Sequence, residues 1–182
     1  KEIKKGLPKN ISLKFLKKKN SPTILKKRYV DKISLSKISG IYSINDDLIS
    51  KSQEFELIKK IKNEIKSHDM IIISDYGHGF ITNKVAKTLT SSKKFLALNA
   101  QINSSNIGYK TMENYKGLDF VVINQRELQH ELRDKHSKVE ILMKKLSDSQ
   151  KIINLVVTRG IDGAILYNSK QKNFFYSDAF ST

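Results

Sequence analysis

The hydrophobic residues of this chain fall into short runs that end at polar turns. The clearest run is Met-Ile-Ile-Ile at 70–73, which is followed at once by Ser-Asp-Tyr-Gly-His-Gly at 74–79. An unbroken apolar run rich in β-branched residues predicts a strand buried on both faces, as in a parallel sheet. Residues 94–98, 120–123 and 155–157 predict three more strands of this kind.

Segments with helical spacing alternate with these strands. Residues 50–65 begin at a serine that can cap a helix, and apolar residues recur at positions 55, 58, 61 and 65. This alternation of helix and strand is typical of a parallel α/β sheet. The other predicted elements are helices at 83–89, 112–115 and 139–146 and strands at 23–31 and 37–44.

The carboxyl ends of the predicted strands carry the candidate chemistry. Ligands of open α/β sheets bind beyond these ends, where Asp75 and His78 follow the first strand and a polar cluster, Asn99 to Asn106, follows the second. Asn99, Gln101 and their neighbours suit neutral hydrogen bonds to a hydroxyl-rich ligand such as a sugar. An ordinary polar loop explains the cluster equally well.

Two later motifs stand at the same kind of position. Asn124 and Glu127 share one side of a first helical turn, where they can orient the waters of a Mg²⁺ ion; alternatively, Glu127 only favours the helix dipole. Thr158, Gly160 and Gly163 form a tight turn whose backbone can approach a phosphate or nucleobase, unless it is a plain hairpin. Neither GxxxxGK[ST] nor GxGxxG occurs.

Charged residues near the start of the chain are open to two interpretations. Lys26 and Arg28 would share one face of a strand and could meet an anionic substrate, or they are solvated edge charges. Asp46 and Asp47 follow in a turn. Adjacent acidic residues on a turn seldom converge on a metal ion, so we expect both to face solvent.

Composition limits the remaining possibilities. A chain of 182 residues predicts a single domain, and no apolar run approaches the ~20 residues of a membrane span. The formal charge of +16 is carried mainly by dispersed lysines, which indicates a general residue bias more than a nucleic-acid patch. Cysteine is absent, which leaves the redox compartment undetermined. No signal peptide is visible, so we expect a cytoplasmic protein. The absence of an initiating Met suggests a fragment.

Taken in order, these residues resemble the PfkB (ribokinase-like) carbohydrate kinases. Asn124-Gln-Arg-Glu127 matches the N-x-x-E motif of that family, and Thr158-Arg-Gly160-Ile-Asp-Gly163 matches its T-x-G-x-x-G turn. Residues 21–31, 74–79 and 99–106 resemble the subgroup of PfkB domains that accompany nucleotidyltransferases, related to the kinase domain of ADP-heptose synthase. The resemblance covers most of the chain from about Gly6 onward.

The resemblance implies a fold and a set of roles. The fold would be a three-layer α/β/α domain over 1–182, incomplete at both ends, with a mainly parallel sheet, a small β lid at 20–47 and a core at 50–182. The activity would be phosphoryl transfer from ATP, with Mg²⁺, to a sugar or sugar phosphate. Implied nucleotide-side residues are Asn124, Glu127, Thr158, Arg159, Gly160 and Gly163, with Glu127 holding the metal through water. Implied substrate-side residues are Asp75, His78, Asn99, Gln101, Lys26 and Arg28.

One departure from the family affects the expected activity. PfkB kinases carry a later G-A-G-D segment that provides the anion hole and the catalytic base, and no such segment occurs in these 182 residues. We therefore expect little turnover from this chain alone, with the catalytic Asp beyond Thr182. The alternatives are a non-catalytic sugar- or nucleotide-binding module and, less favoured, a nucleic-acid binder. The lid is a candidate homodimer contact, and the parent protein a candidate fusion to a nucleotidyltransferase.

Overall fold

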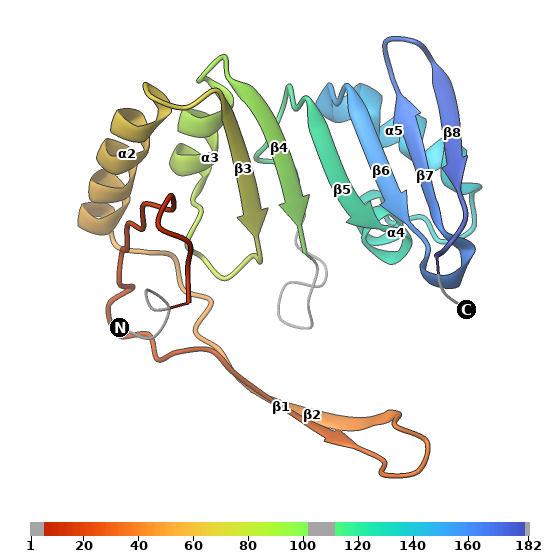
Figure 1. Ribbon diagram of the computed structural model, residues 1–182, viewed down its shortest axis with the longest axis horizontal. Helices are drawn as coiled ribbons and strands as arrows, with labels where there is room; N and C mark the ends of the chain where they lie inside the picture. Colours follow the sequence, from red (N-terminus) through yellow and green to blue (C-terminus); the bar gives the residue numbers. More distant parts are fainter. Residues whose placement is uncertain (1–5, 102–111, 181–182) are drawn as a thin grey trace.

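The computed structural model describes residues 6–101 and 112–180, and its main feature is a six-stranded sheet (Figure 1). The strand order is β3-β4-β5-β6-β7-β8; neighbours from β3 to β6 are parallel, and the last two strands pair antiparallel. This mostly parallel arrangement confirms the predicted α/β class. The strands are β3 (Met70–Asp75), β4 (Phe95–Ala100), β5 (Phe120–Asn124), β6 (Asn154–Thr158), β7 (Ala164–Asn168) and β8 (Asn173–Ser177).

The helices of the described part pack behind this sheet in the view of Figure 1. They are α2 (Lys51–Ile65), α3 (Asn83–Thr90), α4 (Gln125–Leu132) and α5 (Val139–Gln150). Side chains cap three of them, since Ser50, Thr82 and Asn124 each accept a hydrogen bond from a backbone N–H of the first turn. The expected short helix at 112–115 is wrong. That segment is a turn closed by a Tyr115 N–H to Met112 carbonyl bond of 3.0 Å.

The core lies between the helices and one face of the sheet. On that face Ile73, Leu98, Val121 and Leu155 are 4%, 1%, 0% and 0% exposed. The expectation that the run 70–73 is buried on both faces is wrong, because Ile72 is 73% exposed. The reason is that β3 is an edge strand and the helices of the described part cover a single face.

Among the described residues, the opposite face of the sheet carries no charged side chain. Strand alternation and register place only neutral residues there, in a chain of which 29% of residues are charged. The central positions of this face are half-buried by their neighbours, and Ile72 and Phe95 at its margin are exposed. Its positions are Met70, Ile72, Ser74, Phe95, Ala97, Asn99, Phe120, Val122, Asn124, Asn154, Val156, Thr158, Ala164, Leu166, Asn168, Asn173, Phe175 and Ser177.

The predicted lid is a two-stranded ribbon that extends from the body (Figure 1). It consists of β1 (Leu25–Val30) and β2 (Lys37–Ser43), which pair antiparallel and form a sheet of their own. Arg28 lies opposite Gly40, and both strands are largely exposed. An isolated pair of strands is marginally stable in water, so this ribbon depends on its attachment to the core.

The turn between β6 and β7 contains the 3₁₀ helix η1 (Gly160–Asp162) and two glycines in the left-handed region. At Gly163, with φ +77°, a Cβ would lie 2.0 Å from the backbone oxygen of Ser177. At Gly160, with φ +63°, a Cβ would meet no atom of the described residues within 4 Å. Packing against β8 therefore requires Gly163, whereas the space beside Gly160 is open.

This difference gives a matched pair of substitutions. We expect Gly163→Ala to lower the free energy of unfolding by about 3 kcal/mol, since it adds a steric overlap to the left-handed strain. Gly160→Ala carries only the strain, about 1 kcal/mol. Urea unfolding of both variants measures the difference, and equal losses would contradict the packing role of Gly163.

Candidate functional site

The carboxyl ends of β3 to β6 lie along one edge of the sheet, as the parallel arrowheads in Figure 1 show. Asp75 pairs in register with Ala100, and Asn124 with Thr158, so all four strand-end motifs share this edge. Strand alternation divides them between two faces. Asp75 continues the helix-covered face, whereas Asn99, Asn124 and Thr158 continue the uncharged face.

A cavity of about 460 Å³ lies at the β3 end of this edge, beneath the lid. It brings together three of the predicted substrate-side residues, Lys26 from β1 and Asp75 and His78 from the β3 end. Arg28, Asn99 and Gln101 do not line it. We refer to it as the lid cavity; its lining residues are Ile24, Lys26, Ser74, Asp75, Tyr76, His78, Phe80 and Ile81.

Asp75 is held by two donors. Its Oδ1 accepts from the Gly77 backbone N–H at 2.9 Å, and its Oδ2 accepts from the Tyr115 hydroxyl at 2.7 Å. Burial of the Tyr115 ring, and then the charge and hydrogen bond of Asp75, raise the pKa of the Tyr115 hydroxyl well above its ordinary value. The phenol therefore stays protonated and fixes the orientation of the carboxylate.

His78 makes a side-chain hydrogen-bond contact that the sequence did not indicate. Its Nδ1 lies 2.7 Å from Oδ1 of Asp46, and the His78 side chain is 10% exposed. The Nε2 atom is buried and has no hydrogen-bond partner among the described residues. Asp46 is exposed to solvent, as expected, and it also contacts His78, because residues 32 positions apart in the chain meet at the base of the lid.

The other predicted substrate-side residues make backbone contacts. The Asn99 side chain donates from Nδ2 to the Val122 carbonyl at 3.0 Å, which ties β4 to β5. The Gln101 backbone N–H donates to the Asp75 carbonyl at 2.9 Å. The rest of the predicted polar cluster, residues 102–106, lies outside the described residues.

Asn124 and Glu127 form a capping box at the start of α4. The Asn124 side-chain oxygen accepts from the Glu127 N–H, and Oε2 of Glu127 accepts from the Asn124 N–H, both at 2.8 Å. Within residues 6–101 and 112–180, no group of three His, Cys, Asp or Glu residues could hold a metal ion. The pair therefore does not form a direct protein cage for Mg²⁺, and contacts to the ion through water stay a prediction.

The turn after β6 lies beside this capping box. Arg159 donates from Nε to Oε1 of Gln125 at 3.3 Å, and its guanidinium is 3.7 Å from the Asp162 carboxylate. These contacts hold the half-buried Arg159 over the first turn of α4. The open space at Gly160 is next to it in sequence. Together, Asn124, Glu127 and the Thr158–Gly160 backbone form a second cluster, which lies at the ends of β5 and β6, away from the lid side.

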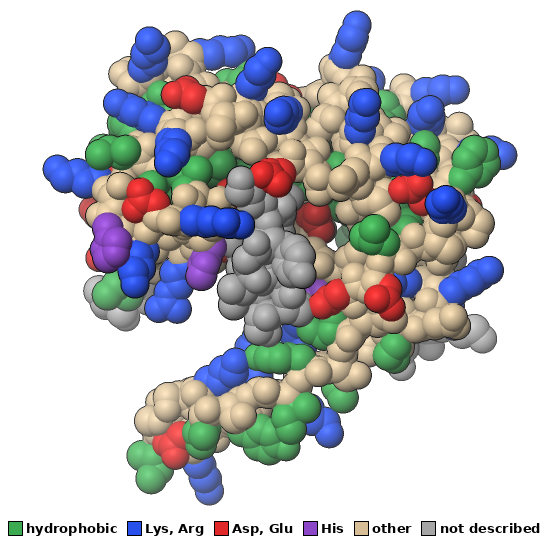
Figure 2. All heavy atoms as spheres, turned by 180° about the vertical axis from the view of Figure 1, so that it is seen from behind, with side chains coloured by type: hydrophobic (Ala, Val, Ile, Leu, Met, Phe, Trp, Pro, Cys, Tyr) green, Lys and Arg blue, Asp and Glu red, His purple; other side chains and the backbone are tan. Residues whose placement is uncertain are grey.

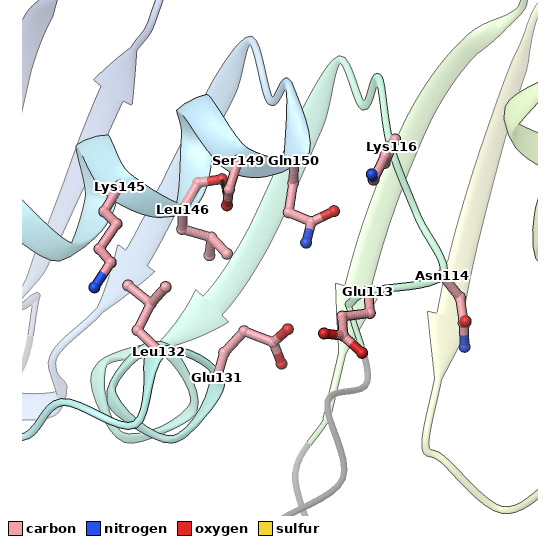
Figure 3. A pocket seen from close by; sticks show the side chains of 9 residues that line it. All are labelled: Glu113, Asn114, Lys116, Glu131, Leu132, Lys145, Leu146, Ser149 and Gln150. Carbon is pink, nitrogen blue, oxygen red and sulfur yellow. Dashed lines mark hydrogen bonds between the residues drawn. The ribbon is translucent and has the colours of Figure 1, made fainter.

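A second cavity, of about 540 Å³, lies away from this edge (Figure 3). It is bordered by the ends of α4 and α5 and by residues 113–116, and no predicted site residue lines it. Figure 2 shows Lys and Arg side chains scattered over the rear face of the molecule rather than gathered in one patch. No helix in the described ranges is long and apolar enough to cross a membrane.

The fold is ribokinase-like. Ribokinase from Giardia lamblia superimposes with a TM-score of 0.67 at 13% identity over 89% of this chain and 50% of that one. Ribokinase from Arabidopsis thaliana, solved with ribose and ATP, gives a TM-score of 0.60 at 13% identity over 90% of this chain and 50% of that one. Identities this low establish the fold alone.

Among curated proteins, the chain is similar to bifunctional HldE proteins. The HldE protein of Sulfurimonas denitrificans is 25% identical over 130 residues, and that of Wolinella succinogenes is 26% identical over 113 residues. These alignments cover 69% and 62% of this chain but 26% and 23% of the relatives, so the chain spans about a quarter of their length. No family model matches the chain. The resemblance to PfkB-type carbohydrate kinases is thus confirmed as a partial similarity.

Two residues that hold this site were not identified from the sequence. Asp46 was assigned to solvent, and Tyr115 fell within a segment expected to be helical. Their partners are 32 and 40 positions away, and no local pattern reports such contacts. Gln125, which receives the Arg159 hydrogen bond, lies within the N-x-x-E motif but is not one of its defining positions.

The Tyr115 contact can be tested by removing one oxygen atom. We expect Tyr115→Phe to destabilise the protein by about 2 kcal/mol, because a hydrogen bond to a charged group is lost in a buried place. Tyr167→Phe is the control; that buried ring stacks on Phe174, and its hydroxyl has no hydrogen bond among the described residues.

The Tyr115–Asp75 hydrogen bond also predicts how the stability of the protein depends on pH. Because the pKa of Tyr115 is raised in the folded state, the unfolded chain loses this proton first as the pH rises past about 10, so stability falls there. The loss should be smaller in Tyr115→Phe. Thermal unfolding between neutral and alkaline pH measures both effects, and an unchanged stability of Tyr115→Phe at neutral pH would contradict the role of the hydrogen bond.

Proposed function

We propose that this chain forms the substrate-binding edge of an ATP-dependent carbohydrate kinase, acting on a sugar or sugar phosphate. The observation that carries the proposal is the lid cavity, in which Lys26, Asp75 and His78 meet at the carboxyl edge of a ribokinase-like sheet. Asn124, Glu127 and the Thr158–Gly160 turn occupy the same edge farther along. A sugar at the first cluster and a nucleotide at the second would therefore bind to one continuous edge.

ATP is the proposed phosphoryl donor. The Arabidopsis ribokinase, which shares this fold, forms a complex with ribose and ATP. On this chain, the open space beside Gly160 would admit a nucleotide close to the backbone, and Arg159 would lie alongside it. Mg²⁺ would be held through water by Glu127 and Asn124, where it would neutralise phosphate charge.

Turnover requires groups beyond this edge. Phosphoryl transfer depends on positioning and charge stabilisation, and the G-A-G-D segment of PfkB kinases does not occur in these 182 residues. We expect the chain alone to bind ligands without family-like rates. The second candidate function is a non-catalytic sugar- or nucleotide-binding module, which the same cavity would serve.

The two candidates are separated by an assay. The chain and the full product of its reading frame are each incubated with ATP, Mg²⁺ and either ribose or fructose 6-phosphate, and ADP release is followed. Release by the full product alone supports the kinase. Sugar and ATP binding without ADP release from either supports the binding module, and rapid release by the 182-residue chain contradicts the need for a further segment.

A substitution at the capping box tests the nucleotide side. We expect Glu127→Gln to weaken Mg²⁺-ATP binding by at least about 10-fold, because a carboxylate beside metal-bound water is lost. The glutamine oxygen can still accept the Asn124 N–H, so the helix cap remains. Isothermal titration with ATP, with and without Mg²⁺, measures the effect, and Glu140→Gln on α5 serves as the control. Equal ATP affinity in both variants would contradict the assignment.

The remaining proposals concern the setting of the chain. Similarity to bifunctional HldE proteins supports a parent in which the kinase domain is fused to a nucleotidyltransferase. The exposed apolar side chains of the lid, among them Ile38 and Ile41, support a homodimer formed through this ribbon. A cytoplasmic location agrees with such a kinase. Nucleic acid is not a proposed partner, since lysines are dispersed along the whole sequence.

A further inference from the structure

We propose that Asp46 orients His78 so that Nε2 of the imidazole accepts a hydrogen bond from a hydroxyl group of the bound sugar. This inference rests on the proposed function, because it takes the lid cavity as the sugar site. It adds a positioning residue, Asp46, that no motif indicated. It also states which part of the ligand meets His78: a hydroxyl rather than a phosphate.

The contact with Asp46 selects the tautomer of the ring. The carboxylate Oδ1 lies 2.7 Å from Nδ1 of His78 and can only accept, so Nδ1 must carry the proton. In the neutral imidazole, Nε2 is then left as the acceptor. A carboxylate that holds one nitrogen thus decides the chemistry presented by the other.

The acceptor that results has no partner within the described part of the protein. Nε2 is buried, and none of the hydrogen bonds of the described residues reaches it. A buried acceptor left without a donor costs about 1–3 kcal/mol, so such atoms call for a functional explanation. Arrival of a donor from a ligand would remove this cost. The observation therefore indicates a group that brings an O–H or N–H.

The surroundings hold the ring in place. Lys18 donates to the His78 carbonyl at 3.2 Å and to the Asn45 carbonyl at 2.8 Å, which joins the His78 turn to the base of the lid. At Gly79, with φ +72°, a Cβ would lie 2.2 Å from the Asp47 carbonyl oxygen, so the two loops are in close contact. The Ile49 N–H donates to the Gly79 carbonyl at 3.0 Å. The backbone on both sides of the His78 ring is thereby held against the base of the lid.

The other charged groups of the cavity favour a hydroxyl over a phosphate at this end. Asp75 is an acceptor beside His78 on the same loop, and its charge would repel a phosphate. The Lys18 ammonium is taken up by backbone carbonyls and the Asn45 side chain. Lys26, which reaches the cavity from the lid, is the cation among the lining residues. A polyol with hydroxyls toward Asp75 and His78 and any phosphate toward Lys26 matches this arrangement.

Nuclear magnetic resonance of the imidazole nitrogens tests the inference directly. The 182-residue chain, labelled with ¹⁵N-histidine, is titrated at about pH 8 with ribose, fructose 6-phosphate or inorganic phosphate. We expect Nδ1 of His78 to be protonated in the free protein. Both sugars should shift the Nε2 resonance toward that of a hydrogen-bonded acceptor, and inorganic phosphate should not. A free protein protonated at Nε2 instead, or a response to inorganic phosphate alone, would overturn the proposal.

Substitutions at Asp46 and His78 separate the orientation of the imidazole from a general effect on folding. Asp46→Ala should lose the Nδ1–H tautomer preference and weaken fructose 6-phosphate binding about 10-fold, whereas Asp47→Asn, in the same turn, should change neither. His78→Gln keeps an acceptor oxygen at the end of a side chain of similar reach and should retain more affinity than His78→Leu. Thermal unfolding checks that each variant is folded. Equal affinity of the Gln and Leu variants would contradict the role of Nε2.

These readouts do not depend on catalysis. If the full product of the reading frame releases no ADP but the sugars shift Nε2, the kinase assignment fails and the hydroxyl contact stands. If ADP is released and Nε2 does not respond to the phosphorylated sugar, the kinase stands and the role of His78 fails. If neither sugar binds, the lid cavity is not the sugar site and the inference falls with it.

Discussion

The register of the four parallel strands is the constraint on which the rest of the structure depends. Ile73, Leu98, Val121 and Leu155 lie side by side across β3 to β6, and all four are buried against the helices. A slip of one residue in any pairing would turn every side chain of that strand to the opposite face. It would move Asp75 away from the Tyr115 hydroxyl. The buried layer thus fixes where each polar strand end lies along the sheet and to which face its side chains point.

Several motif residues have structural duties that do not require a ligand. Asn124 and Glu127 satisfy each other's backbone N–H groups, and Gly163 allows the turn after β6 to approach β8. These contacts fix the positions of the capping residues and of the turn at the carboxyl edge of the sheet. Gly160 differs, because no atom of the described residues lies close enough to exclude a side chain at this position.

The parallel strands β3 to β6 and the helices α2, α3 and α5 followed from local pattern, whereas β7 and β8 were not predicted. The run 70–73 predicted β3, and the N-x-x-E spacing predicted a helix start that the structure shows as a capping box. The exposure of Ile72 could not be inferred, because an apolar run reports strand character and not the number of covered faces. The contacts of Asp46 and Tyr115 could not be predicted for a related reason. They depend on how distant loops fold back, and no short window of sequence contains this information.

The uncharged face of the sheet has a consequence for how separate copies of this chain behave in solution. Exposed apolar side chains of this face, such as Ile72 and Phe95, favour contact between copies, while a net charge of +16 repels whole molecules from one another. Added salt shortens the reach of that repulsion to about 8 Å at physiological ionic strength without weakening the hydrophobic attraction. Copies of this chain should therefore associate more readily at high ionic strength than in dilute buffer.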